Sequence, residues 1–449
     1  LSDAGEPSTI SSLSSKPAIT GDKVVIGLIS LPYKRVDLEG LDALSPRVVP
    51  ASAKRSEITG VIDDTGGTSD LLNMLQVIYD IAPSATVVVG SPGINSTPAQ
   101  MHALIDQLVA GSGSAGSAGY VPPANIIVDD LDFLTQNPFE VGEISEAIID
   151  ARAAGVLYIT AAGDGGHYET SNSTSNVYVE NFNSQTPTSN TGIYAKVFGN
   201  LHAFSANQFE LTLSEPHLDI CVYWNEDPGD PVESNDIIML AFPGNDAAKL
   251  VELSNFGTQP GGCLSEQYSP VPDLPTGTKL LFEDNSEALQ TDRFMVVGRR
   301  GIVYNGQSQT PSLDSLTGAF DLSTPGAIRG HAYHPDALTV GTTPYIKVGS
   351  DVKAFDDPST ELTVSDYSAD GESISQQRFY WKNVGSGSPN WLPIASGAGA
   401  VAKPDMTAAS SITVKDSNDT ALVYKGTSAS AAVTAGIAAL YWEFRQWQL

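Results

Sequence analysis

Short apolar runs alternate with amphipathic runs over the first third of the chain. The apolar runs are continuous and rich in Val and Ile, which is typical of strands buried in a parallel sheet. The amphipathic runs repeat their apolar residues with helical spacing. The predicted strands are 24–30, 85–89, 125–130 and 156–161, and the predicted helices are 70–81, 98–110 and 141–154. This alternation predicts an α/β fold with a doubly wound parallel sheet, in which sites lie at the carboxyl ends of the strands.

Between residues 195 and 334 the pattern changes to short apolar runs separated by Gly, Pro, Asn and Asp. Such spacing is typical of an antiparallel β-sandwich. The expected strands are 209–213, 218–224, 237–240, 279–282 and 293–297. From Val340 onward the first pattern returns. We therefore expect one α/β domain, residues 1–194 and 335–449, interrupted by an inserted sandwich.

The composition narrows the class of protein. A formal net charge of −29 and a sequence pI near 4.3 argue against binding to nucleic acid, which needs a basic surface. No apolar run approaches the about 20 residues of a membrane-spanning helix. Cys221 and Cys263 are the two cysteines. In an exported chain they would form a disulfide, and in a reducing compartment they would be two buried thiols.

The sequence indicates no cofactor. It contains no HExxH, P-loop or dinucleotide-binding motif, and the two cysteines lack the spacing of a zinc site. Asp416, Asn418 and Asp419 could bind a structural calcium ion, or they could form an exposed turn, because their spacing fits no known calcium loop. We expect the protein to act without a required cofactor.

Near the C-terminus, a glycine and two hydroxyl residues precede a long run of small and apolar residues, 429–440. Gly426 allows a turn, and the run that follows predicts a buried helix. Ser428 would then lie at the helix N-terminus, where unpaired N–H groups favour a negative atom. At such a place a serine can be a nucleophile or a helix cap, and the local sequence leaves both open.

Several motifs occur together in one order along the chain. They are Ile81-Ala82-Pro83, Ala161-Ala162-Gly163-Asp164-Gly165, Leu338-Thr339-Val340-Gly341, Lys403-Pro404-Asp405 and Gly426-Thr427-Ser428-Ala429-Ser430-Ala431. In this order the chain resembles the subtilisin–sedolisin clan of serine peptidases. The resemblance covers most of residues 23–194 and 335–449, and bacterial members with a β-sandwich inserted at the same point look similar.

The resemblance implies a role for two residues. Ser428 matches the nucleophile, and Asp164 matches the residue that donates to the oxyanion. An aspartate can donate only when it is protonated, so the resemblance implies activity at acidic pH or a raised pKa. The alternative for Asp164 is a turn residue, since Asp-Gly is common in turns.

The base is where the chain departs from the family pattern. Asp70 stands where subtilisins place His and sedolisins place Glu, and it could equally be a first-turn carboxylate of its helix. Leu31 and Met74 stand where the family places a second acid. Asp130 could supply that acid, or it could be a strand-end carboxylate that binds water or a cation. His167 follows the Asp164 loop, but a surface position is the simpler interpretation for it.

These residues predict an exported serine endopeptidase, secreted or periplasmic, that hydrolyses peptide bonds with Ser428 as nucleophile. Asp70, helped by Asp130, would take the proton, and Asp164 would stabilise the oxyanion. The substrate would be a protein or peptide, and the sandwich could bind a ligand of its own. The alternative is a catalytically inactive relative that binds protein or glycan, which the missing histidine, Leu31 and Met74 favour.

Overall fold

The computed structural model places the two halves of the α/β region and the segment between them. The described residues are 19–32, 54–57, 69–93, 96–115, 120–133, 136–138, 141–166, 176–188, 191–206, 208–214, 218–224, 237–253, 261–264, 274–284, 293–300, 322, 328–343, 365, 368–369, 380–382, 391–393, 403–415 and 420–446.

A seven-stranded sheet forms the centre of the α/β region, with the strand order β19-β16-β5-β4-β1-β3-β2. Every pair of neighbours is parallel. The strands are β1 (Val25–Ile29), β2 (Lys54–Glu57), β3 (Thr86–Gly90), β4 (Ile126–Asp129), β5 (Leu157–Ala161), β16 (Leu338–Thr343) and β19 (Met406–Ala409). The sheet confirms the predicted fold class, and its four N-terminal apolar runs became β1, β3, β4 and β5.

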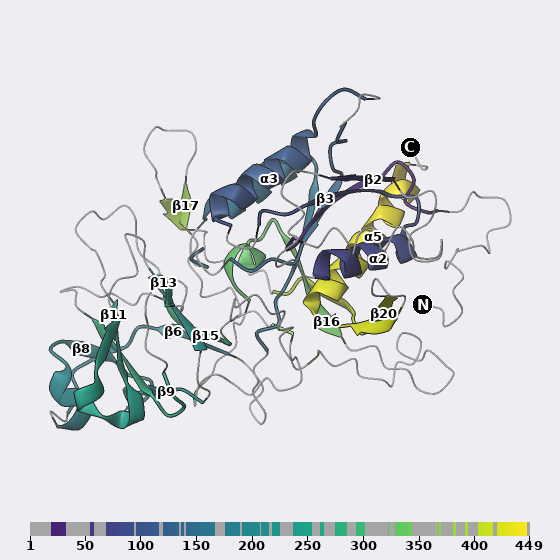
Figure 1. Ribbon diagram of the computed structural model, residues 1–449. Coiled ribbons are helices and arrows are strands. Elements are labelled where there is room, and N and C mark those ends of the chain that lie inside the picture. Colours follow the sequence, from purple (N-terminus) through teal and green to yellow (C-terminus); the bar gives the residue numbers. More distant parts are fainter. Residues whose placement is uncertain are drawn as a thin grey trace, which may run out of the picture.

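Helices cover both faces of this sheet, as a doubly wound fold requires (Figure 1). On one face α2 (Asp70–Ile81) and α5 (Thr427–Gln446) lie side by side over Ile126 and Val128. On the other face α3 (Pro98–Ala110) and α4 (Glu143–Ala153) cover Ile127 and Tyr158. Successive side chains of β4 therefore alternate between two cores, which explains why its sequence is apolar throughout.

A glycine lets α2 and α5 approach closely. A Cβ at Gly436 of α5 would lie 2.9 Å from Cβ of Ile81, the last residue of α2. Only a residue without a side chain fits this crossing. The close contact brings the first turn of α5, which carries Ser428, to the same side of the sheet as Asp70.

The segment between the α/β halves folds as two antiparallel sheets, with the orders β13-β10-β15-β6 and β12-β11-β14-β8-β7; β9 pairs with β14. We call residues 177–300 the antiparallel insert. Its strands are β6 (Val177–Asn181), β7 (Ser184–Gln185), β8 (Asn200–His202), β9 (Leu211–Thr212), β10 (Leu218–Trp224), β11 (Ile237–Phe242), β12 (Val251–Leu253), β13 (Gly261–Leu264), β14 (Lys279–Asp284) and β15 (Arg293–Arg300). Side chains of both sheets share one core.

The antiparallel pairing begins at β6, earlier than the residue 195 that we predicted from the sequence. The apolar stretch of β6 is only three residues long, which gave no strand signal by itself. Four short helical turns, η1 (Gly192–Lys196), η2 (Pro243–Asn245), η3 (Ala247–Lys249) and η4 (Gly330–Tyr333), and the strands β17 (Tyr380–Lys382), β18 (Trp391–Pro393), β20 (Ile412–Lys415) and β21 (Ala421–Tyr424) complete the described elements.

A disulfide holds part of the insert. Cys221 on β10 is disulfide-bonded, and it lies opposite Cys263, the only other cysteine of the sequence, on β13. The bond agrees with the oxidised alternative that we weighed for an exported chain. Among the described helices, none is both long enough and apolar enough to cross a bilayer.

Glu443, near the end of α5, holds the chain just before β1. Its Oε2 atom accepts hydrogen bonds from the backbone N–H groups of Thr20, Gly21 and Asp22, at 2.8, 2.6 and 3.2 Å. The side chain is only 4 % exposed. Replacing Glu443 by Gln should lower the free energy of unfolding by about 2–3 kcal/mol, because hydrogen bonds to a charged acceptor are each worth about 1.5–3 kcal/mol. Urea unfolding measures this loss.

The exposed Glu180 on β6 provides a matched control, since Glu180→Gln makes the same chemical change at the surface. We expect that control to change stability by less than about 0.5 kcal/mol. Equal stability of Glu443→Gln and wild type would show that the three N–H groups are satisfied equally well without the charge.

Candidate active site

Ser428 is the second residue of α5, which begins at Thr427. It therefore lies inside the first turn and does not occupy the cap position. The side chain is partly exposed, whereas its neighbours Thr427 and Ala429 are buried. Ser428 thus presents a hydroxyl at the N-terminus of a helix whose residues 429–436 are buried in the core, and the cap interpretation is wrong.

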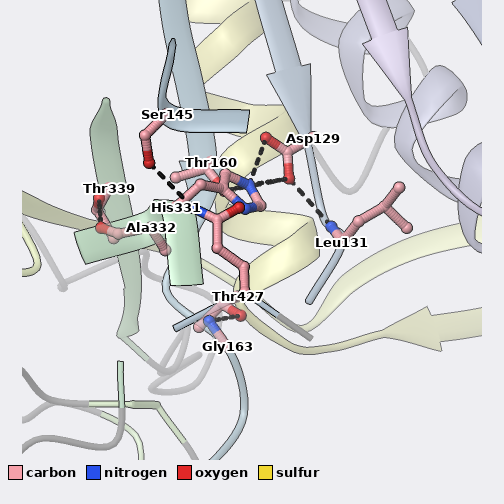
Figure 2. Close-up of polar contacts among 10 residues, drawn as sticks. Asp129, Leu131, Ser145, Thr160, Gly163, His331, Ala332, Thr339 and Thr427 are labelled. Carbon is pink, nitrogen blue, oxygen red and sulfur yellow. Dashed lines mark hydrogen bonds and ion pairs between the residues drawn. The ribbon is translucent and has the colours of Figure 1, made fainter. Parts of the chain in front are cut away.

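Asp164, in the loop after β5, caps this helix instead. Its Oδ1 atom accepts a hydrogen bond from the Thr427 amide at 3.0 Å and from the Thr427 hydroxyl at 3.1 Å. The Thr427 hydroxyl also accepts from the Gly163 amide at 3.1 Å (Figure 2). These bonds fix the plane of the carboxyl group, so that Oδ1 is used as an acceptor and Oδ2 is left on the opposite side.

The Oδ2 atom of Asp164 faces Gly426. A Cβ on Gly426 would lie 2.9 Å from this oxygen, and the backbone there has a φ of +106°, which non-glycine residues rarely adopt. Burial raises the pKa of the Asp164 carboxyl above its usual range, hydrogen bonds from Thr427 oppose that rise, and the charge of Asp70 adds to it. Asp164 can thus hold a proton on Oδ2 in the acidic range.

Asp130 follows the last residue of β4 and points to the Ser428 side of the sheet. Burial raises the pKa of its carboxyl well above the usual range, and the charges of Asp70 and Asp129 raise it further. The hydroxyl groups of Ser30 and Ser428 lie close enough to lower it. The Oδ1 atom of Asp130 is buried and has no hydrogen-bond partner of good geometry among the described residues.

Asp70 is the first residue of α2 and is partly buried. Its negative charge raises the pKa of Asp130 and also that of Asp164, which places all three carboxyl groups within one electrostatic neighbourhood. A carboxylate in the first turn of a helix is favoured in its ionised form by the helix dipole. The structure therefore brings Ser428, Asp70, Asp130 and Asp164 together.

Tyr424 is a member of this cluster that the sequence did not single out. It ends β21, four residues before Ser428, and it is 7 % exposed. Burial raises the pKa of its phenol well above the usual value, and the charges of Asp70, Asp130 and Asp164 add to the rise, while the nearby Ser428 hydroxyl lowers it. The phenol remains protonated at any ordinary pH and supplies a donor beside Ser428.

A second polar cluster lies on the other face of the sheet. The sequence placed Asp129 at the end of a strand but did not indicate its partners. Figure 2 shows Asp129 with interactions to His331, Thr160 and the Leu131 amide. His331 Nε2 lies 3.1 Å from Asp129 Oδ1 and 3.3 Å from Oδ2. Thr160 Oγ1 donates to the same Oδ1 at 3.1 Å. Asp129 and Asp130 thus follow one another in the chain but serve opposite faces.

The Lys403-Pro404-Asp405 motif has a structural role. The buried Lys403 ammonium donates to the Ala337 carbonyl and to Asp405 Oδ2, both at 2.6 Å, and the same oxygen accepts from the Thr339 amide at 2.7 Å. These bonds join the segment before β19 to β16. Burial lowers the pKa of Lys403, and its bond to Asp405 opposes the change.

The remaining candidates lie outside the site or outside the described part. Met74, where the family pattern has an acid, is fully buried in the core of α2 and α5. His167 and the proposed calcium residues Asp416, Asn418 and Asp419 are not among the described residues. Within the described residues, no group of three or more His, Cys, Asp or Glu side chains is placed to hold a metal ion.

Comparison with solved structures finds proteases at low similarity. The CspB protease of Clostridium perfringens matches with a TM-score of 0.47 and 12% identity, over 95% of this chain and 84% of that one. Pseudomonas sedolisin, a serine-carboxyl proteinase complexed with two molecules of pseudo-iodotyrostatin, matches with a TM-score of 0.41 and 12% identity, over 99% and 81%. The prenylagaramide maturation protease PagA matches with a TM-score of 0.37 and 11% identity, over 94% and 76%.

No protein-family model matches the chain, and no curated protein matches it. At TM-scores below 0.5 the structural likeness carries no inference about activity. The function has to be inferred from the site itself.

Proposed function

We propose that the protein is a serine endopeptidase in which a pair of aspartates replaces histidine as the base. The observation that carries this proposal is the convergence of Ser428, at the N-terminus of a buried helix, with the carboxyl groups of Asp70 and Asp130. The order of motifs along the chain, which resembles the subtilisin–sedolisin clan, supports the same conclusion. A protein or peptide is the expected substrate.

The pair divides into an ionised and a neutral member. We assign the charge to Asp70, which lies in the first turn of α2 where the helix dipole favours an anion, and the proton to Asp130, whose pKa burial raises well above the usual range. Asp130 is the neutral one and lies next to the Ser428 hydroxyl. As Ser428 Oγ attacks the peptide carbonyl carbon, Asp130 accepts the serine proton and passes its own to Asp70. Such a pair shares one proton, so its titration belongs to both residues.

The same groups complete the reaction. The tetrahedral oxyanion receives a hydrogen bond from protonated Asp164 Oδ2, and the Tyr424 phenol is a further donor beside Ser428. When the intermediate collapses, the C–N bond breaks and the proton on the aspartate pair goes to the leaving amine. Water then attacks the acyl ester, the pair takes a proton from that water, and Ser428 regains its proton as the product acid leaves.

We further propose that the protein works outside the reducing cytoplasm. The disulfide at Cys221 supports this proposal, because such bonds persist in oxidising compartments. A net charge of −29 keeps a protein soluble in such a setting.

Labelling with a serine-directed fluorophosphonate over a range of pH tests the proposed function. We expect covalent labelling that is fastest on the acidic side of neutrality and is abolished in Ser428→Ala, with peptide hydrolysis following the same pattern. Labelling or hydrolysis that persists in Ser428→Ala would remove Ser428 as the nucleophile. If the wild-type protein is not labelled and cleaves no peptide at any pH, the result would favour the alternative, a catalytically inactive relative that binds protein or glycan.

A further inference from the structure

Three polar contacts connect the last residue of β4 and the chain that follows it to the antiparallel insert and to the segment leading back from it. We call these contacts the clasp. They join His331 Nε2 to Asp129 Oδ1 at 3.1 Å, Arg329 Nη2 to Asp132 Oδ2 at 2.5 Å, and Asn137 Nδ2 to the Trp224 carbonyl at 2.9 Å. The residues on the β4 side, Asp129, Asp132 and Asn137, bracket Asp130 and the loop that extends from it.

The His331 side chain is buried where it forms its clasp contact. It is 1 % exposed, and the rings of Phe133 and Tyr158 meet it edge-on with centroid distances of 6.2 and 6.3 Å. Its Nε2 atom is used for Asp129, while Nδ1 is buried with no hydrogen-bond partner among the described residues. The imidazole is therefore oriented by two polar neighbours at Nε2, the Asp129 carboxylate and the Thr160 hydroxyl, whose oxygen lies 3.3 Å away.

The Asp129 contacts also set the direction of the chain at Asp130. Asp129 Oδ1 accepts from the Leu131 amide at 3.1 Å, which closes a turn around Asp130. Because the Asp129 side chain is held on the α3–α4 face, the next residue is turned toward Ser428 on the other face. A rotation of Asp129 would move the Asp130 carboxyl with it.

The other side of the clasp consists of Trp224 of the insert and of Arg329 and His331, whose segment packs against the insert. Trp224 ends β10, and Ala332 and Tyr333 of η4 share a core with Cys221 and Met295 of the insert. Arg329 precedes this anchored turn, and His331 is its second residue. The clasp is thus tied to the body of the insert through a packed core, and the insert holds the β4 loop from outside the parallel sheet.

From this arrangement we infer that the antiparallel insert is a positioning element of the active site: through the clasp it fixes the β4 loop and so holds Asp130 beside Ser428. The expected effect on catalysis rests on the proposed function. The expected effect on the β4 loop does not depend on it. Stability alone does not explain the clasp, since buried polar pairs are often no more stabilising than apolar contacts of the same volume. Polar pairs with defined partners select one conformation of a loop.

The experiment uses full-length variants and two measurements. Arg329→Met and His331→Leu remove a donor while keeping an apolar side chain, and His331→Gln restores an N–H donor. Hydrogen exchange at the Leu131 amide measures how firmly the β4 loop is held. Fluorophosphonate labelling and peptide hydrolysis measure the reactivity of the site. Lys279→Met is the matched control, because it removes a hydrogen bond of the insert, from Nζ to Thr212 at 2.7 Å, away from the clasp.

We expect Arg329→Met and His331→Leu to speed exchange at Leu131 at least tenfold and to lower kcat about tenfold with little change in KM. His331→Gln should recover most of both, and Lys279→Met should change neither. Unchanged exchange at Leu131 in Arg329→Met and in folded His331→Leu, together with unchanged kcat, would overturn the inference. If the wild type proves inactive, the exchange result still decides whether the clasp holds the loop, and if His331→Leu does not fold, Arg329→Met decides it.

Discussion

Replacing Asp130 by Asn is expected to lower kcat/KM for peptide hydrolysis by about 10²–10⁴-fold, the usual contribution of a positioned proton-transfer group. Asparagine has nearly the same shape but cannot take the Ser428 proton and pass another on. Asp130 is also the carboxyl whose pKa the Ser428 hydroxyl lowers directly, which marks it as the neighbour of the nucleophile. The loss should appear at every pH, because no titration restores the relay.

The substitution Asp70→Asn distinguishes the role of Asp70 from that of Asp130. Removing the Asp70 charge takes away one cause of the raised pKa of Asp130, so that Asp130 ionises more readily and can act as the base itself. We expect a smaller loss than in Asp130→Asn, with the remaining activity moved along the pH axis. Asp106→Asn on the exposed side of α3 is the control for removal of one negative charge. Activity of Asp130→Asn within threefold of wild type would exclude the relay.

Asp164→Asn is expected to change the pH profile more than the maximal rate. In the wild type the Asp164 pKa is raised by burial, so the protonated donor persists above the usual range, and activity falls as pH rises through that pKa. An amide donates at every pH. The Thr427 amide and hydroxyl, which now bond Oδ1, would orient the Asn oxygen and leave its NH₂ group facing Gly426. The alkaline fall should move up by at least about one pH unit.

A second substitution provides the contrast. Asp164→Leu removes the donor altogether and should lower kcat by about 10²–10³-fold at all pH, the size of the effect of losing one oxyanion donor. Thermal unfolding of both variants separates this effect from misfolding. Since a group with a raised pKa stabilises the fold at low pH and loses that contribution as pH rises, Asp164→Asn should be at least as stable as wild type at neutral pH. An unchanged alkaline limb in Asp164→Asn would assign that limb to another group.

The sequence predicted the parts of this protein that depend on local pattern. The helices 70–81 and 98–110 have the predicted bounds, because their apolar spacing and capping residues are local signals. Asp130 became a candidate because acids at the ends of parallel strands converge at one edge of the sheet, and Asp164 because its loop also resembles that of the peptidase clan.

Contacts between distant segments were not predictable in this way. His331 and Asp129 are 202 positions apart, and nothing in the Gly330–Tyr333 stretch signals a partner on β4. Tyr424, although it lies only four residues before Ser428, was overlooked because a tyrosine at the end of a strand is usually part of a core. Strand β6 was not predicted, because its pairing partner, β15, lies more than a hundred residues further along the chain.

The bonds from Glu443 to Thr20, Gly21 and Asp22 have a consequence for the order in which the chain is made. Strand β1 leaves the ribosome before α5, the helix that packs on the same core and carries Ser428. The face of the sheet that α2 and α5 share is therefore covered by α2 alone until α5 has been synthesised. A nascent chain has its acids and its insert but no assembled nucleophile, so the catalytic cluster comes together only when translation has passed α5.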